Sequence, residues 1–67
     1  MCRSIKTLRP PYVDHASDDD VHAAALQFVR KVSGYRAPSK RNEVAFNEAV
    51  DEVTEASRRL IQAVTGA

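Results

Sequence analysis

The turn between residues 30 and 41 constrains the fold of this chain most. Gly34 and Pro38 lie close together in it, and each disfavours continuation of a helix. Helical patterns of apolar residues precede and follow the turn. A link this short predicts that the two helices turn back on each other as an antiparallel pair. The sequence therefore predicts an all-α antiparallel helical hairpin.

The first helix is predicted to run from about residue 18 to residue 33. Ser17 is a favourable N-cap, and Asp20 stands three residues later, as in a capping box. Gly34 follows as the residue that ends the helix. Apolar residues recur at helical spacing and predict the face that meets the core: Val21, Ala25, Phe28 and Val32, widened by Ala24, Leu26 and Val29.

The second helix is predicted over about residues 40 to 64, with Ser39 as its cap after Pro38. Its apolar stripe consists of Phe46, Val50, Val53, Leu60 and Val64. At 1.5 Å per residue this helix is about 37 Å long, against about 24 Å for the first. The longer helix therefore overhangs its partner, and either the N-terminal arm or a second molecule is expected to cover the excess.

Residues 1–16 are predicted to form an extended arm, because Pro10 and Pro11 forbid a regular helix there. Ile5, Leu8 and Tyr12 are expected to lie across the helices and complete a small core. The whole chain, residues 1–67, is then a single small helical domain, with the arm at 1–16 and the hairpin at 17–65.

The composition excludes several classes of protein. A single cysteine permits no intramolecular disulfide. There is no signal-peptide pattern and no apolar run of about 20 residues that could span a membrane, so we expect a cytoplasmic protein. The net charge of +1 gives too weak a field to favour nucleic acid. We find no catalytic motif, phosphate loop or metal-ligand spacing, and expect no cofactor, no metal and no enzymatic activity of the monomer.

The overhanging end of the second helix is the leading functional feature. Leu60, Ile61 and Val64 would form an exposed apolar surface on a very small protein. We therefore predict a homo-oligomer, or a module that binds a protein partner through this face.

A second hypothesis places an anion site in the basic turn, which holds half of the ten Lys and Arg residues. The start of a helix attracts anions through its free N–H groups and its dipole, and nearby cations could hold a phosphate or a nucleic-acid backbone. The residues of this site would be Arg30, Lys31, Arg36, Ser39, Lys40 and Arg41. The alternative is that Ser39 satisfies the N–H groups itself and that the cations are solvated or pair with the acidic second helix. Recognition of nucleic acid by that acidic helix is disfavoured.

A third hypothesis concerns the thiol of Cys2. If Met1 were removed, an N-terminal cysteine would place its thiol beside an α-amino group, with Arg3 favouring the thiolate. The alternative is that Cys2 is a small apolar residue packed against the helices.

Three blocks of sequence resemble a family of short bacterial proteins known as Domain of Unknown Function 2277. The blocks are the opening Met1-Cys2-Arg3-Ser4-Ile5-Lys6-Thr7-Leu8-Arg9-Pro10-Pro11, the central Ala24-Ala25-Leu26-Gln27-Phe28-Val29-Arg30-Lys31-Val32-Ser33-Gly34, and the run from Pro38-Ser39 through Asn42-Glu43, Ala45-Phe46 and Ala49-Val50. The resemblance covers nearly the whole chain and implies a bacterial protein. It implies no activity, cofactor or catalytic residue.

Overall fold

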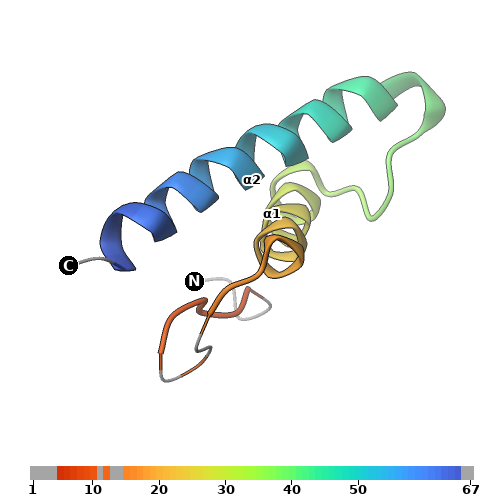
Figure 1. Cartoon of the computed structure of the whole chain (residues 1–67). Helices are drawn as coiled ribbons and strands as arrows, with labels where there is room; N and C mark the ends of the chain where they lie inside the picture. Colours follow the sequence, from red (N-terminus) through yellow and green to blue (C-terminus); the bar gives the residue numbers. More distant parts are fainter. Residues whose placement is uncertain (1–4, 11, 13–14, 66–67) are drawn as a thin grey trace.

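The computed structural model describes residues 5–10, 12 and 15–65. Two helices, α1 (Asp18–Ser33) and α2 (Glu43–Thr65), are joined by a linker that ends in the short 3-10 helix η1 (Lys40–Asn42). The chain reverses between the helices and α2 crosses over α1 (Figure 1). The predicted all-α helical hairpin is therefore confirmed.

Both ends of α1 are fixed by its own neighbouring residues, as predicted. The backbone N–H of Asp20 donates to Oγ of Ser17 at 3.1 Å, and the backbone N–H of Ser17 donates to Oδ2 of Asp20 at 3.0 Å. At the other end Gly34 adopts a left-handed conformation with φ of 79°, and its N–H donates to the carbonyl of Arg30 at 2.9 Å. Glycine adopts this conformation without the steric penalty that a Cβ brings.

The core lies where α1 crosses the first half of α2. Ala25 and Val29 of α1 pack there with Phe46 and Val50 of α2. Half-buried apolar residues surround this cluster: Leu26, Ala49 and Val53. The core is small, since Val21 is the one further buried hydrophobic residue in the described part of the chain.

The two helices differ in length, as expected from the sequence. α1 has 16 residues and α2 has 23, which correspond to about 24 Å and about 35 Å. The core cluster includes no residue after Val53. The last turns of α2 therefore extend beyond the place where the two helices pack together (Figure 1).

The start of the second helix differs from the prediction. Residues 40–42 form η1 and the α-helix begins only at Glu43. Ser39 has the extended backbone of an N-cap, but its side chain makes no capping hydrogen bond. Its carbonyl instead accepts from the N–H of Asn42 at 3.0 Å, which closes a turn through the backbone alone. The prediction that the Ser39 side chain caps the helix was wrong.

The described part of the arm lies against a side of α1 that faces away from the core. Lys6 and Leu8 border a shallow hollow with Ala23, Ala24 and Gln27 of α1. At 3.6 residues per turn, this side of α1 lies about 150° around the helix from the side that carries Val21, Ala25 and Val29.

Two of the arm residues expected in the core are partly covered and one is not. Ile5 and Leu8 are half-buried. Tyr12 is 68% exposed; its N–H donates to the carbonyl of Arg9 at 2.9 Å, which closes a turn. Placing Tyr12 in the core was therefore wrong.

Candidate functional site

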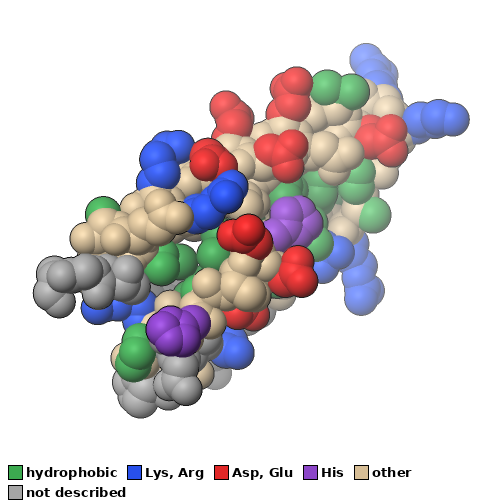
Figure 2. Space-filling view, viewed as in Figure 1, with side chains coloured by type: hydrophobic (Ala, Val, Ile, Leu, Met, Phe, Trp, Pro, Cys, Tyr) green, Lys and Arg blue, Asp and Glu red, His purple; other side chains and the backbone are tan. Residues whose placement is uncertain are grey.

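An apolar groove of about 430 Å³ runs along one side of the contact between the helices. Phe46 and Val29, both buried, belong to its lining. Other apolar side chains line it from the two helices and from the linker: Phe28, Val32, Tyr35, Ala45, Ala49 and Val53. Hydrophobic side chains lie between the helices in Figure 2, while acidic side chains follow the outer side of α2.

The α1 wall of the groove corrects the core predicted from sequence. Phe28 and Val32 were expected in the core, but they are 45% and 71% exposed. Val29, which was expected only to widen the stripe, is buried. Because α2 crosses α1, it covers the side of Val29 and leaves Phe28 and Val32 at the edge of the contact.

The overhanging end of α2 carries the residues predicted as an interface. Leu60 is 63% exposed, whereas Ile61 and Val64 are half-buried. Leu60 therefore offers more apolar surface than either of its predicted companions.

The α2 wall of the groove continues toward this end of the helix. At 100° per residue, the directions of Ala49, Val53, Ala56 and Leu60 fall within about 60° of one another. Ala56 is exposed like Leu60. An apolar face thus begins in the groove and continues along α2 to Leu60.

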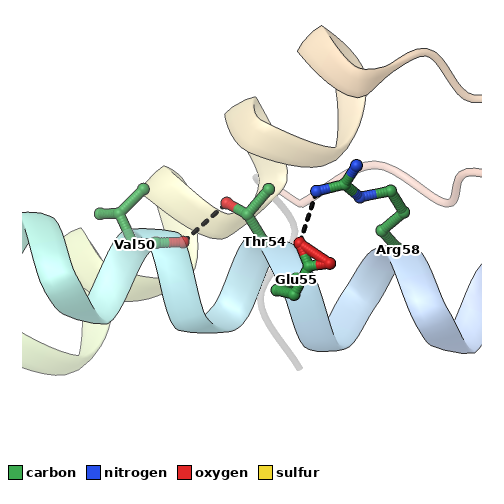
Figure 3. Close-up of polar contacts among 4 residues, drawn as sticks. All are labelled: Val50, Thr54, Glu55 and Arg58. Carbon is green, nitrogen blue, oxygen red and sulfur yellow. Dashed lines mark hydrogen bonds and ion pairs between the residues drawn. The ribbon is translucent and has the colours of Figure 1, made fainter.

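The polar contacts of α2 drawn in Figure 3 lie on a different side of the helix from this apolar face. At 100° per residue, Thr54, Glu55 and Arg58 point about 130–170° away from it. The hydroxyl of Thr54 donates to the carbonyl of Val50 at 2.6 Å. Nη2 of Arg58 lies 2.5 Å from Oε1 of Glu55, which makes an ion pair. Both contacts stay within α2. The Nε of Arg58 is buried and has no hydrogen-bond partner among the described residues. No charged side chain belongs to the lining of the groove.

The basic turn is divided into two parts. Nε of Arg30 donates to the carbonyl of Arg36 at 2.8 Å, and both border a second hollow of about 220 Å³ together with Lys31. Ser39, Lys40 and Arg41 are exposed and are not part of that lining. Lys and Arg side chains extend into solvent at the η1 end of α2 (Figure 2). The six residues predicted as one anion site thus do not line one hollow.

The thiol hypothesis falls on Cys2, which lies outside the described residues. Within the described residues, no three His, Cys, Asp or Glu side chains come together in a way that could hold a metal ion. Neither described helix is both long enough and apolar enough to cross a membrane.

Sequence reasoning missed the groove, although it carried one sign of it. Ala49, Ala56 and Ala63 recur every seven residues on α2, with Ala45 beside them. Small side chains repeated in this way allow a second helix to approach closely. The other wall depends on how the helices cross, which the periodicity of each helix does not specify.

Comparison with known proteins gives a family and no function. Searches against curated proteins and solved structures found no match. A family described as an uncharacterized conserved protein, DUF2277, matches residues 1–67, the full length of the chain. The chain therefore belongs to the DUF2277 family.

Proposed function

We propose that this protein is a small interaction module that binds a helical segment, its own or that of a protein partner, through the apolar side of α2. The binding surface, which we call the association surface, combines the groove with the exposed end of its α2 wall: Phe28, Val32, Ala45, Ala49, Ala56 and Leu60. Amphipathic helices commonly bind in apolar grooves of this kind.

The exposure of Leu60 in line with the groove carries the proposal. Fully burying a leucine side chain stabilises a protein by about 1.5–3 kcal/mol. Leu60 and Val32 are mostly exposed, while the described core contains only five buried hydrophobic residues. In so small a chain, covering these side chains with another helix offers a large gain relative to the stability of the monomer.

The solution mass tests this proposal. Light scattering over a wide range of protein concentration should show a mass that rises with concentration. Leu60→Asp should abolish the rise, because it places a charge in the apolar contact. Val44→Asp is the matched control, since Val44 is 69% exposed and points about 160° away from Leu60 around the helix.

The control should associate like the wild type. A wild-type mass that stays monomeric at all concentrations would rule out self-association. The proposal would then hold only if a helix of a different protein binds the association surface. Equal loss of association in both variants would show that the association surface is not the binding site.

Phosphate binding at the basic turn is a second candidate. The observation in its favour is the hollow where Arg30, Lys31 and Arg36 converge, with Arg30 held by the Arg36 carbonyl. Inorganic phosphate should then raise the melting temperature, less so in high salt. An Arg36→Ala variant should lose that rise. An unchanged melting temperature in the wild type would exclude this candidate.

The setting of the proposed function is the bacterial cytoplasm. A chain with one cysteine cannot form an internal disulfide, which suits a reducing compartment. The homo-oligomer predicted from sequence belongs to the same proposal.

A further inference from the structure

We infer that the helix filling the groove is α2 of a second copy, and that the two chains pair antiparallel about a two-fold axis near Val53. This inference rests on the proposed function and specifies its partner. A two-fold pair uses the same surface on both chains, so each groove would receive the α2 end of the other chain.

The spacing along α2 fits such a pair. An axis between positions 52 and 53 places Leu60 opposite Ala45 of the second copy, and Ala56 opposite Ala49. The protruding Leu60 side chain then enters the second copy's groove, beside its Phe28 and Val32. Alanine facing alanine lets the two helices approach closely, while the leucine fills the space at each end.

The charges of α2 favour the same orientation. Acidic residues occupy its first two thirds, at Glu43, Glu48, Asp51, Glu52 and Glu55, and Arg58 and Arg59 follow. A parallel pair would align the acidic parts with each other. An antiparallel pair brings Arg59 beside Glu48 of the second copy, twice by symmetry, on the solvent side of the contact.

Disulfide trapping tests the register directly. In a Cys2→Ser background, Ala49→Cys and Ala56→Cys chains are prepared separately, mixed and oxidised. The mixture should give a cross-linked heterodimer, because the two positions face each other. Either variant alone should give little cross-linked dimer, since the cysteines of its two chains would lie about 10 Å apart along the helices. Mixing Val44→Cys with Ala56→Cys is the control, because position 44 lies away from the association surface.

Charge reversal gives a second test that leaves the core intact, because both side chains are exposed. Glu48→Arg or Arg59→Glu alone should weaken dimerisation about three- to ten-fold, given two surface contacts per dimer. The double variant should recover the wild-type dissociation constant. Circular dichroism confirms that each variant is folded.

The outcomes separate this inference from the proposed function. A dimer by mass that gives no selective 49–56 cross-link, and no recovery in the charge-reversed double variant, would overturn the antiparallel pair while leaving self-association in place. A protein that is monomeric at every concentration would overturn this inference together with the self-association on which it rests. Selective cross-linking with recovery of affinity would establish the two-fold pair.

Discussion

The two helices are stabilised in different ways, although both are amphipathic along their whole length. α1 has its first turn capped by Ser17 and Asp20 and its last turn closed by Gly34. α2 follows the 3-10 helix η1, at the start of which the Ser39 side chain makes no capping hydrogen bond. Its core contacts end at Val53, twelve residues before the helix does.

The difference shows that an apolar stripe identifies a face but not how much of that face is covered. Beyond Val53, the Glu55–Arg58 ion pair lies within α2 itself. A pair of this kind stabilises a helix by about 0.2–0.5 kcal/mol. On the last turns of α2, Ile61 and Val64 are half-buried, whereas Leu60 is 63% exposed. One side of this end is therefore covered and another is not.

The largest expected effect contrasts the covered and uncovered parts of the α2 stripe. Phe46 is 8% exposed, and Phe46→Ala should destabilise the protein by about 3–5 kcal/mol, enough to unfold most of a chain this small. Leu60→Ala, measured in dilute protein so that association does not contribute, should change stability by less than about 0.5 kcal/mol. Urea denaturation followed by circular dichroism measures both. Similar losses would mean that the end of α2 is packed within the monomer.

A smaller effect contrasts the two helix starts. Ser17→Ala removes the hydroxyl that accepts from the Asp20 N–H. It should lower the free energy of unfolding by about 1 kcal/mol. Ser39→Ala removes a hydroxyl that makes no capping bond, and should cost less than about 0.5 kcal/mol. Thermal unfolding of the two variants beside the wild type measures the difference. An equal cost would show that Ser39 does cap α2 in solution.

The smallest effect is a pH dependence at the start of α1. Hydrogen bonding with Ser17, first through its backbone N–H and then through its side chain, lowers the pKa of Asp20 from its usual 3.8. A carboxyl with a lowered pKa adds stability above its ordinary pKa, and this contribution is lost as the pH falls through the folded value.

Asp20→Asn should therefore be less stable than the wild type near neutral pH. The difference in stability should narrow as the pH falls below the usual pKa of 3.8 and through the lowered pKa of Asp20, because the wild-type carboxylate becomes protonated. Melting temperatures recorded at several pH values measure the gap. A gap that stays constant over this range would show that ionised Asp20 does not stabilise the cap.

Predictions that rest on neighbours in sequence agree with the structure best. The limits of α1, its capping box and its terminal glycine follow from hydrogen bonds between residues at most four apart. The predictions for Tyr12, Phe28 and Val32 fail because each concerns contact between distant segments. An apolar residue on the correct side of a helix is exposed when the neighbouring helix crosses before reaching it.

The sequence by itself therefore determined two helices, the turn between them and their unequal lengths, because helix periodicity and helix ends are local properties. The tertiary structure alone decided which part of each apolar face is buried. It set the crossing that leaves a groove between Phe28 and Ala49, and it placed Leu8 on the side of α1 away from the core. The physical reason is that burial depends on the angle and position at which two faces meet, and neither helix encodes these alone.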